Sequence, residues 1–158
     1  MSRASLERAV PKGGRILLDA STLISYLGEP DAVTPLATVV IDEWVRSGRN
    51  AAVISTVTAM EVLVGPLTRG PGEDYLHVRD FLERFPNLRA QPVDLSVAQE
   101  AASLRAEHHF RTPDALVIAT GLASQVAHLV TNDEAWKKRL SSISSRVNVC
   151  YLKDHHPL

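Results

Sequence analysis

Short apolar segments alternate with helical segments along the chain, and this alternation restricts the possible folds more than any other feature. Each apolar segment is rich in Val, Ile, Leu or Ala and is bounded by polar, Gly or Pro residues, which is the pattern of a buried strand. Strands separated by helices form parallel sheets with helices on both faces. The sequence therefore predicts an α/β fold, a three-layer α/β/α sandwich with a central, mainly parallel sheet. The expected strands are residues 15–19, 51–55, 88–95, 127–131 and 147–152.

Several of the intervening segments carry helix signals. Residues 35–48 open with Pro and close on Gly, with apolar residues spaced for one face. Residues 96–109 are rich in Ala and begin with Ser96, a residue type that commonly caps a helix N-terminus. Residues 74–85 are also expected to be helical, and their apolar side chains are expected in the core: Tyr75, Leu76, Phe81, Leu82 and Phe85.

The composition is that of an ordinary globular domain. Of the 158 residues, 45% are hydrophobic and 22% are charged, and a chain of this size buries about 70% of its unfolded surface. The net charge of −1 gives no support to a generally basic coat, so any binding of nucleic acid requires a local patch. We expect residues 1–158 to form one domain, with residues 1–14 as an N-terminal lead. Residues 153–158 are expected to be a frayed tail.

The cysteine count and the hydropathy indicate a cytoplasmic protein. Cys150 is the only cysteine, which excludes an internal disulfide and a cysteine-rich metal cluster and fits a reducing compartment. The first residues lack the apolar core of a secretory signal. No apolar run reaches the length of a membrane span, so no contact with a membrane is expected.

Acidic residues occur where the predicted strands end. Asp19 closes the first strand, Glu61 lies in the helix after the second, and Asp133 follows the run that ends at Thr131. These transitions lie along the carboxyl edge of a parallel sheet, where such folds place their ligands. Asp114 stands in the first turn of a helix that leads by a short turn into residues 127–131, so this helix begins above the same edge. All four carboxylates are therefore expected to converge.

Helix capping is the alternative explanation for each acid taken alone. Thr58 and Glu61 fit a capping box, Asp114 follows a strong helix start, and Asn132 or Asp133 could cap the next helix. Capping does not require the acids to share one edge, however, and clustered carboxylates repel each other unless cations neutralise them. Oxygen ligands without nearby cysteine favour Mg²⁺, with Mn²⁺ as a substitute. An acidic cluster with a divalent metal points to phosphate chemistry, most often phosphodiester hydrolysis by a metal-activated water.

The ordered set of motifs "LLDASTLISYL", "STVTAMEVLVG", "LRAEHHFRTPDALVIATGLA" and "LVTNDEAW" resembles the motifs of PIN-domain nucleases. More narrowly, the set resembles the VapC-type toxins of bacterial toxin–antitoxin pairs. The resemblance extends over residues 15–152, and its most specific part is "RTPDALVIAT" followed by "LVTND". It implies a PIN-like fold, an Mg²⁺-dependent endoribonuclease and a VapB-type antitoxin partner. A homodimer is also expected.

The resemblance assigns roles to individual residues. Asp19, Glu61 and Asp114 match the principal catalytic acids, and Asp133 matches the fourth; Asp19 and Asp114 are the expected metal ligands. Two hydroxyl residues, Ser21 and Thr131, match supporting positions, where we expect them to bind carboxylates or metal waters. The chain departs from the usual pattern in its longer lead, residues 1–14, and in Trp136, where many relatives carry another aromatic residue.

Basic residues near the expected site are candidates for RNA contacts. Arg111, three residues before Asp114, is suited to contact phosphate or to balance the acidic cluster. Lys137, Lys138 and Arg139, together with Arg146 and Lys153, offer a local basic face for an RNA backbone, although such runs are also common on solvated helix surfaces.

Two other classes of function remain open from the sequence. "LLDAST" partly resembles the aspartyl-phosphate motif of haloacid dehalogenase-like phosphatases, but Ser21 occupies the position of their second acid. A catalytically inactive PIN-like module that binds RNA or protein is the second alternative. The four retained acids disfavour this alternative, because clustered negative charge repels phosphates.

Overall fold

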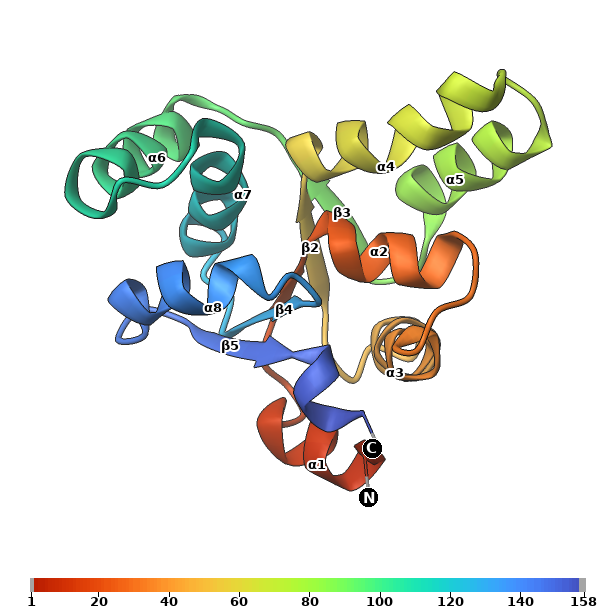
Figure 1. Cartoon of the computed structure of the whole chain (residues 1–158), viewed down its shortest axis with the longest axis horizontal. Helices are drawn as coiled ribbons and strands as arrows, with labels where there is room; N and C mark the ends of the chain where they lie inside the picture. Colours follow the sequence, from red (N-terminus) through yellow and green to blue (C-terminus); the bar gives the residue numbers. More distant parts are fainter. Residues whose placement is uncertain (1, 157–158) are drawn as a thin grey trace.

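Five parallel strands form one sheet in the order β3-β2-β1-β4-β5 in the computed structural model, which describes residues 2–156. All five expected strands are present, with narrower bounds, and every pairing is parallel as predicted. The chain builds the sheet outward from β1 in one direction through β2 and β3, and then returns to add β4 and β5 on the other side (Figure 1). The strands are β1 (Ile16–Leu18), β2 (Ala52–Ser55), β3 (Leu88–Gln91), β4 (His128–Thr131) and β5 (Asn148–Tyr151).

Helices cover both faces of this sheet, which confirms the three-layer α/β/α sandwich (Figure 1). One face carries α2 (Ala20–Leu27), α3 (Thr34–Thr38), the π-helical segment η1 (Val39–Val45), α4 (Thr56–Arg69) and α5 (Glu73–Arg84). The other face carries α6 (Leu95–His108), α7 (Thr112–Ala123) and α8 (Ala135–Leu140). The remaining elements are α1 (Ser2–Ala9) and the short 3₁₀ segments η2 (Ser141–Ile143) and η3 (Leu152–His155). None of the helices in residues 2–156 combines the length and the apolarity that a membrane span requires.

The alternation of side chains along β1 divides the core between the two helical layers. Ile16 and Leu18 pack towards α2 to α5, whereas Leu17 packs towards α6 to α8. All three side chains are fully buried, as expected for the central strand of a sheet that is covered on both faces. β1 is therefore packed on both faces, which holds the next residue, Asp19, in place.

Two helices begin at residues other than those expected. Asp94, not Ser96, caps α6, because β3 ends at Gln91 and the Asp94 carboxylate accepts a hydrogen bond from the Val97 backbone N–H at 2.9 Å. Likewise, Ser55 caps α4 through the Val57 N–H, so the capping box of Thr58 and Glu61 is wrong. In both cases an oxygen acceptor earlier in the chain than the predicted one starts the helix sooner.

The first and last described elements pack together and are part of the fold. Leu6 and Val10 are fully buried, and the Ser5 hydroxyl and His155 Nδ1 are hydrogen-bonded at 2.8 Å. The expectation of a frayed tail is therefore wrong as far as His155; Met1 and residues 157–158 lie outside the described residues. The expectation for Leu76 is also wrong, since it is 57% exposed on the outer face of α5.

Candidate functional site

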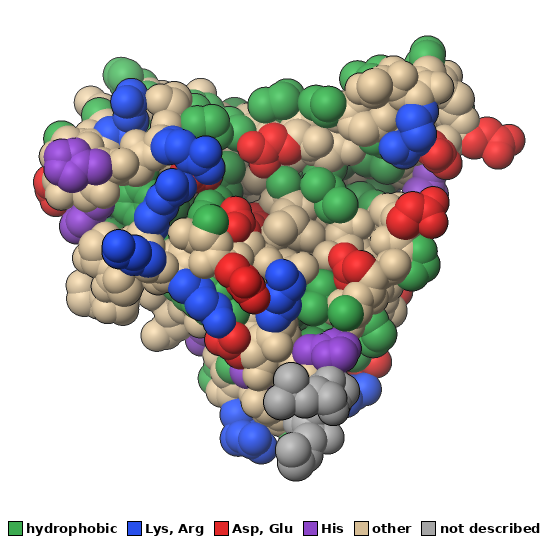
Figure 2. All heavy atoms as spheres, in the orientation of Figure 1, with side chains coloured by type: hydrophobic (Ala, Val, Ile, Leu, Met, Phe, Trp, Pro, Cys, Tyr) green, Lys and Arg blue, Asp and Glu red, His purple; other side chains and the backbone are tan. Residues whose placement is uncertain are grey.

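All four predicted acids line one pocket at the carboxyl edge of the sheet. The pocket has a volume of about 180 Å³ and lies where β1 and β4 end, the point at which the chain reverses its direction across the sheet. In parallel α/β sheets this reversal leaves a crevice for ligands. Figure 2 shows acidic side chains near the middle of this face, with Lys and Arg side chains beside them towards α7 and α8. The lining residues are Asp19, Ala20, Ser21, Glu61, Arg111, Asp114, Val117, Asp133 and Trp136.

Asp19 is held at the end of β1 by a set of uncharged donors. Its carboxylate caps α2 by accepting a hydrogen bond from the Thr22 N–H at 3.0 Å. Ser21 Oγ donates to both carboxylate oxygens, at 2.8 and 2.9 Å, and Thr131 Oγ1 donates to Oδ2 at 2.5 Å. Burial raises the pKa of Asp19, and these hydrogen bonds oppose that effect. The acid is therefore rigidly oriented.

The two supporting hydroxyls also bind the loop that follows β4. Ser21 Oγ accepts a hydrogen bond from the Asn132 N–H at 2.8 Å, and Thr131 Oγ1 accepts one from the Asp133 N–H at 3.0 Å. Asp133 in turn accepts from the Ala135 N–H at 2.9 Å, but the N-cap of α8 is Glu134, so neither Asn132 nor Asp133 is the cap residue that the sequence predicts. Hydrogen bonds thus join the end of β1 to the end of β4 and fix two of the four acids relative to each other.

Asp114 lies in the first turn of α7 and, unlike Asp19, contacts cationic side chains. Oδ2 accepts hydrogen bonds from Arg139 Nη1 at 2.9 Å and from Arg111 Nε at 3.2 Å. Oδ1 accepts a bond from the Trp136 indole N–H at 3.3 Å. Neither the Trp136 contact nor the Arg139 contact with Asp114 is predicted from the sequence. The only hint is that the two residues are three positions apart, which places them on one face of a helix.

Glu61 projects from α4 into the same pocket. Burial raises the pKa of Glu61, and the negative charges of Asp114 and Asp19 raise it further. Within residues 2–156, no side chain or backbone group donates a hydrogen bond to its carboxylate. The charges of Asp114 and Asp19 affect the pKa of Glu61 because acids from three separate elements face one another in this pocket.

The donor set suits a hard divalent cation. The pocket offers carboxylate and hydroxyl oxygens and no sulfur or imidazole ligand, and Mg²⁺ is typically held by one or two carboxylates together with water. No three Asp, Glu, His or Cys side chains of the described residues already form a ready ligand set.

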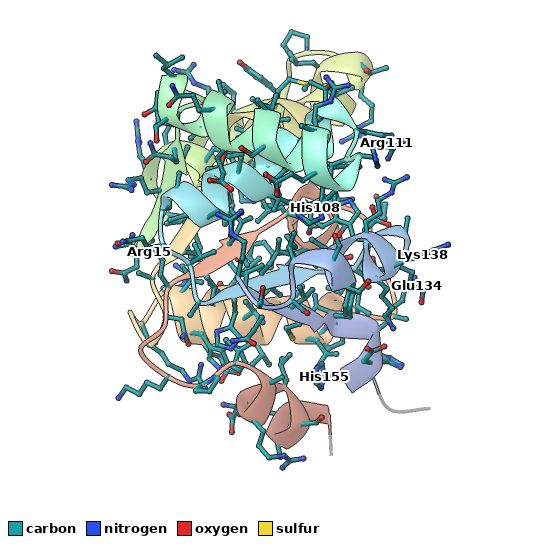
Figure 3. All side chains as sticks on the ribbon, turned by 90° about the vertical axis from the view of Figure 1, so that its left-hand side faces the viewer. Arg15, His108, Arg111, Glu134, Lys138 and His155 are labelled. Carbon is teal, nitrogen blue, oxygen red and sulfur yellow. The ribbon has the colours of Figure 1, made fainter. Side chains whose placement is uncertain are left out.

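Some residues of the predicted basic face pair with acidic side chains, and others remain exposed. Lys137 pairs with Asp154 at 2.5 Å, and Arg146 pairs with Glu100 on α6 at 2.5 Å. Lys138 is exposed and forms no ion pair within residues 2–156. Figure 3 shows Lys138 and Glu134 on the same side of the molecule as Arg111. Arg139, in contrast, pairs with Asp114, which lines the pocket.

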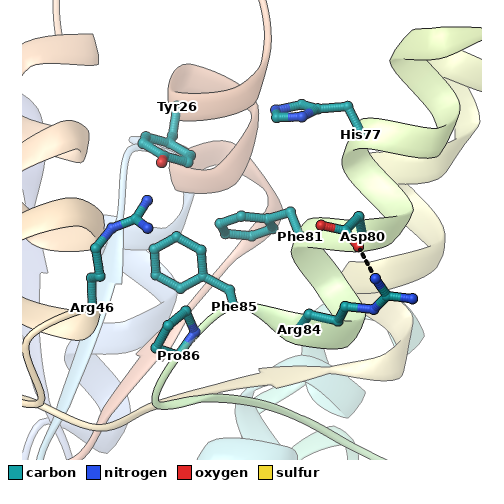
Figure 4. Close-up of a pocket in the computed structure, with 8 residues that line it drawn as sticks. All are labelled: Tyr26, Arg46, His77, Asp80, Phe81, Arg84, Phe85 and Pro86. Atoms are coloured by element: carbon teal, nitrogen blue, oxygen red, sulfur yellow. Dashed lines mark ion pairs between the residues drawn. The ribbon is translucent and has the colours of Figure 1, made fainter.

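A second cavity of about 250 Å³ lies between α5, α2 and η1 and shares no lining residue with the acidic pocket (Figure 4). The rings of Phe81 and Phe85 are tilted by 48° with their centres 4.7 Å apart, and the Arg46 guanidinium lies 4.7 Å from the centre of the Phe85 ring. Its one acid, Asp80, pairs with Arg84 at 3.1 Å. This cavity lacks a cluster of acids, so it is not the candidate catalytic site.

Several solved structures have the same fold as this chain. A chain of a toxin–antitoxin complex from Klebsiella pneumoniae is 22% identical, with a TM-score of 0.66 over 87% of this chain and 97% of that chain. FitAcB from Neisseria gonorrhoeae is 20% identical, with a TM-score of 0.64 over 87% and 98%. The sarcin–ricin-loop-cleaving toxin VapC20 from Mycobacterium tuberculosis is 15% identical, with a TM-score of 0.63 over 85% and 98%. At these identities the similarity concerns the fold.

The family of this chain is shown by a match between its sequence and a family model. A comparison with curated proteins finds no match. The family model described as "PIN domain" matches residues 16–139, which is most of the chain and includes all four acids of the pocket. The chain belongs to the PIN-domain family.

Proposed function

We propose that this protein is a metal-dependent endoribonuclease that acts as the VapC-type toxin of a toxin–antitoxin pair. The observation that carries the proposal is the pocket in which Asp19, Glu61, Asp114 and Asp133 meet at the reversal point of the sheet. Two solved structures of the same fold are described as a toxin–antitoxin complex and as a toxin that cleaves the sarcin–ricin loop. RNA is accordingly the proposed substrate, and the phosphodiester bond is the proposed point of hydrolysis.

Asp19 and Asp114 would hold Mg²⁺, with Mn²⁺ as a substitute. Bound Mg²⁺ would activate water and stabilise the charge that develops on the phosphate. The chain's own residues then have separate tasks. Asp19 is oriented by Ser21 and Thr131, so its oxygens stay in one position. Glu61 has a raised pKa and, among residues 2–156, no donor to its carboxylate, which suits a group that orients water and accepts a proton.

Arg111 and the lysines of α8 would bind the RNA backbone. Arg111 is largely exposed at the rim of the pocket, with its side chain 68% accessible, and Lys138 is exposed nearby. Lys137 would contribute after exchange of its partner Asp154, since a surface ion pair of this kind contributes at most about 1 kcal/mol. Such contacts give affinity without sequence selectivity.

A VapB-type antitoxin and a second copy of the chain are the proposed protein partners, in the cytoplasm. Exposed apolar side chains on α2 and α4 offer a surface for a protein partner, since Ile24, Met60, Val64 and Leu67 are each about half exposed. A short neighbouring reading frame that encodes a DNA-binding domain with an extended tail would support the toxin assignment.

Cleavage of structured RNA by the purified chain, free of any antitoxin, tests the proposal. We expect cleavage that requires Mg²⁺ and is abolished by Asp114→Asn, whereas the matched exposed control Glu73→Gln keeps full activity. Expression of the wild-type chain alone should arrest growth, and Asp19→Ala should relieve the arrest. If no RNA is cleaved, or if Asp114→Asn cleaves as well as wild type, a binding module becomes the better explanation. The phosphatase alternative lacks its second acid, because Ser21 occupies that position and donates hydrogen bonds to Asp19.

A further inference from the structure

Asp114 is the one acid of the pocket that cationic side chains contact within residues 2–156. Asp19 is satisfied by hydroxyl groups and a backbone N–H, and Glu61 has no donor among the described residues. Asp114, in contrast, pairs with Arg139 at 2.9 Å and with Arg111 at 3.2 Å. The positive charge that the clustered acids require is therefore supplied, in part, by the protein itself.

Arg139 is the better placed of these two arginines. Its side chain is 38% exposed, compared with 68% for Arg111, so its charge is less screened by solvent. It lies 25 residues from Asp114 along the chain, and it reaches the carboxylate because Trp136, one turn earlier on α8, packs in the core and donates to the same acid. The contact is thus a tertiary one, fixed by the packing of α8 against α7.

A cation that binds Asp114 has to compete with this guanidinium. Arg139 and Arg111 both occupy Oδ2, and Trp136 occupies Oδ1. A divalent metal takes either the lone pair of Oδ1 that Trp136 leaves free or a position on Oδ2 that an arginine occupies, and in both cases the positive charge of Arg139 repels it. The hydrogen bond to Arg139 is therefore expected to weaken when Asp114 becomes a metal ligand, and a metal on Oδ2 has to displace it.

We propose that Arg139 is a displaceable internal counter-ion, which occupies Asp114 in the metal-free protein and lowers the affinity of the pocket for divalent metal. Arg139 is in this sense a positioning residue that acts through Asp114. The inference rests on the proposed metal site but not on nuclease activity. Replacing Arg139 should consequently strengthen metal binding, which is the opposite of what is expected when a purely structural contact is lost.

Mn²⁺ titration of the RNA-free protein, followed by calorimetry and by the electron paramagnetic resonance of free Mn²⁺, tests the inference. We expect Arg139→Gln to lower the dissociation constant for Mn²⁺ by about three- to tenfold, the range expected for removal of a partly exposed competing charge. Arg139→Lys keeps the charge and should stay within about twofold of wild type. Lys138→Gln removes the same charge one residue away without a contact to a carboxylate, and it should also change the affinity by less than about twofold.

The variant Asp114→Asn, used as a background, tests the proposed metal site separately from the counter-ion role of Arg139. In that background Arg139→Gln should have no further effect, because its partner is gone. If Asp114→Asn binds Mn²⁺ as tightly as wild type, the proposed metal site itself is wrong. If Asp114→Asn weakens binding but Arg139→Gln leaves the affinity unchanged or weakens it, only the counter-ion role is overturned.

The wild-type protein provides a second measurement in case Arg139→Gln is poorly folded. The side-chain N–H signals of arginine, followed by NMR during an Mg²⁺ titration, report directly on the Arg139 guanidinium. We expect the Arg139 signal to shift with metal saturation as its hydrogen bond to Asp114 is lost. A signal that stays unchanged up to saturation would overturn the proposal.

Discussion

Thr131→Val removes one hydroxyl from the junction between β1 and β4 while almost preserving the shape of the side chain. Thr131 is fully buried, donates to Asp19 Oδ2 at 2.5 Å and accepts from the Asp133 N–H at 3.0 Å. A hydrogen bond to a charged group contributes about 1.5–3 kcal/mol, and loss of the acceptor for the Asp133 N–H adds about 1 kcal/mol, since Asp133 is only half-buried. We therefore expect the free energy of unfolding to fall by about 2–4 kcal/mol, as measured by urea denaturation.

The pH dependence of this loss makes the prediction more specific. Burial raises the pKa of Asp19 in the folded state above its unfolded value, so ionisation of Asp19 destabilises the fold, and this penalty grows as pH rises through the folded-state pKa. The Thr131 hydroxyl reduces the penalty by stabilising the carboxylate. The destabilisation by Thr131→Val should hence be smaller in acid, where Asp19 is protonated, and should grow as the pH rises through the folded-state pKa of Asp19.

Thr120→Val is the matched control. Thr120 is equally buried, but its hydroxyl donates to the uncharged Leu116 carbonyl at 2.8 Å within α7. This control should cost about 0.5–1.5 kcal/mol at both pH values. A Thr131→Val loss that is no larger than that of the control, or that does not change with pH, would refute the role of Thr131 as a support of the Asp19 carboxylate.

Three further predictions concern other parts of the molecule. Burial and the charges of Asp114 and Asp19 raise the pKa of Glu61, so ionisation of Glu61 destabilises the folded protein. Without divalent metal, Glu61→Gln should therefore raise the thermal unfolding midpoint at neutral pH but not in acid. An unchanged midpoint at neutral pH would contradict this. Leu6 of α1 is fully buried, so Leu6→Ala should lower the free energy of unfolding by about 2–5 kcal/mol, as measured by urea denaturation. A loss below about 1 kcal/mol would mean that α1 does not unfold together with the rest of the domain. Burial raises the pKa of Cys150 to about 12, so a thiol reagent in mildly alkaline buffer should label it only after unfolding, and rapid labelling of native protein would refute its burial.

The sheet and the convergence of the acids follow from local sequence features. Asp19 and Asp133 come directly after apolar runs that form β1 and β4, and the parallel arrangement places the ends of both strands at one edge. Asp114 reaches the same edge because α7 runs back towards β4 through a short turn. Strand-to-helix transitions of this kind are readable in a single sequence, since the apolar pattern and the helix start are both local.

Features that depend on tertiary contacts could not be predicted in the same way. Ser55 and Thr58 both offer a capping oxygen, and the choice between them depends on where β2 stops pairing with its neighbours. The pairing of Arg139 with Asp114 depends on how α8 packs, so the sequence shows only a basic helix. The docking of α1 through Leu6 likewise requires partners from distant parts of the chain.

The contact of α1 with η3 has a practical consequence for protein engineering. Because Ser5 and His155 are hydrogen-bonded, the first and last elements meet at one end of the molecule, whereas the acidic pocket lies at the ends of β1 and β4 (Figure 1). A short linker could join these elements, and new termini could be opened in the exposed loop between α4 and α5 at Gly70 to Gly72. A circular permutant of this design would place an affinity handle or a fluorophore beside α4 and α5, where it could report on a bound partner.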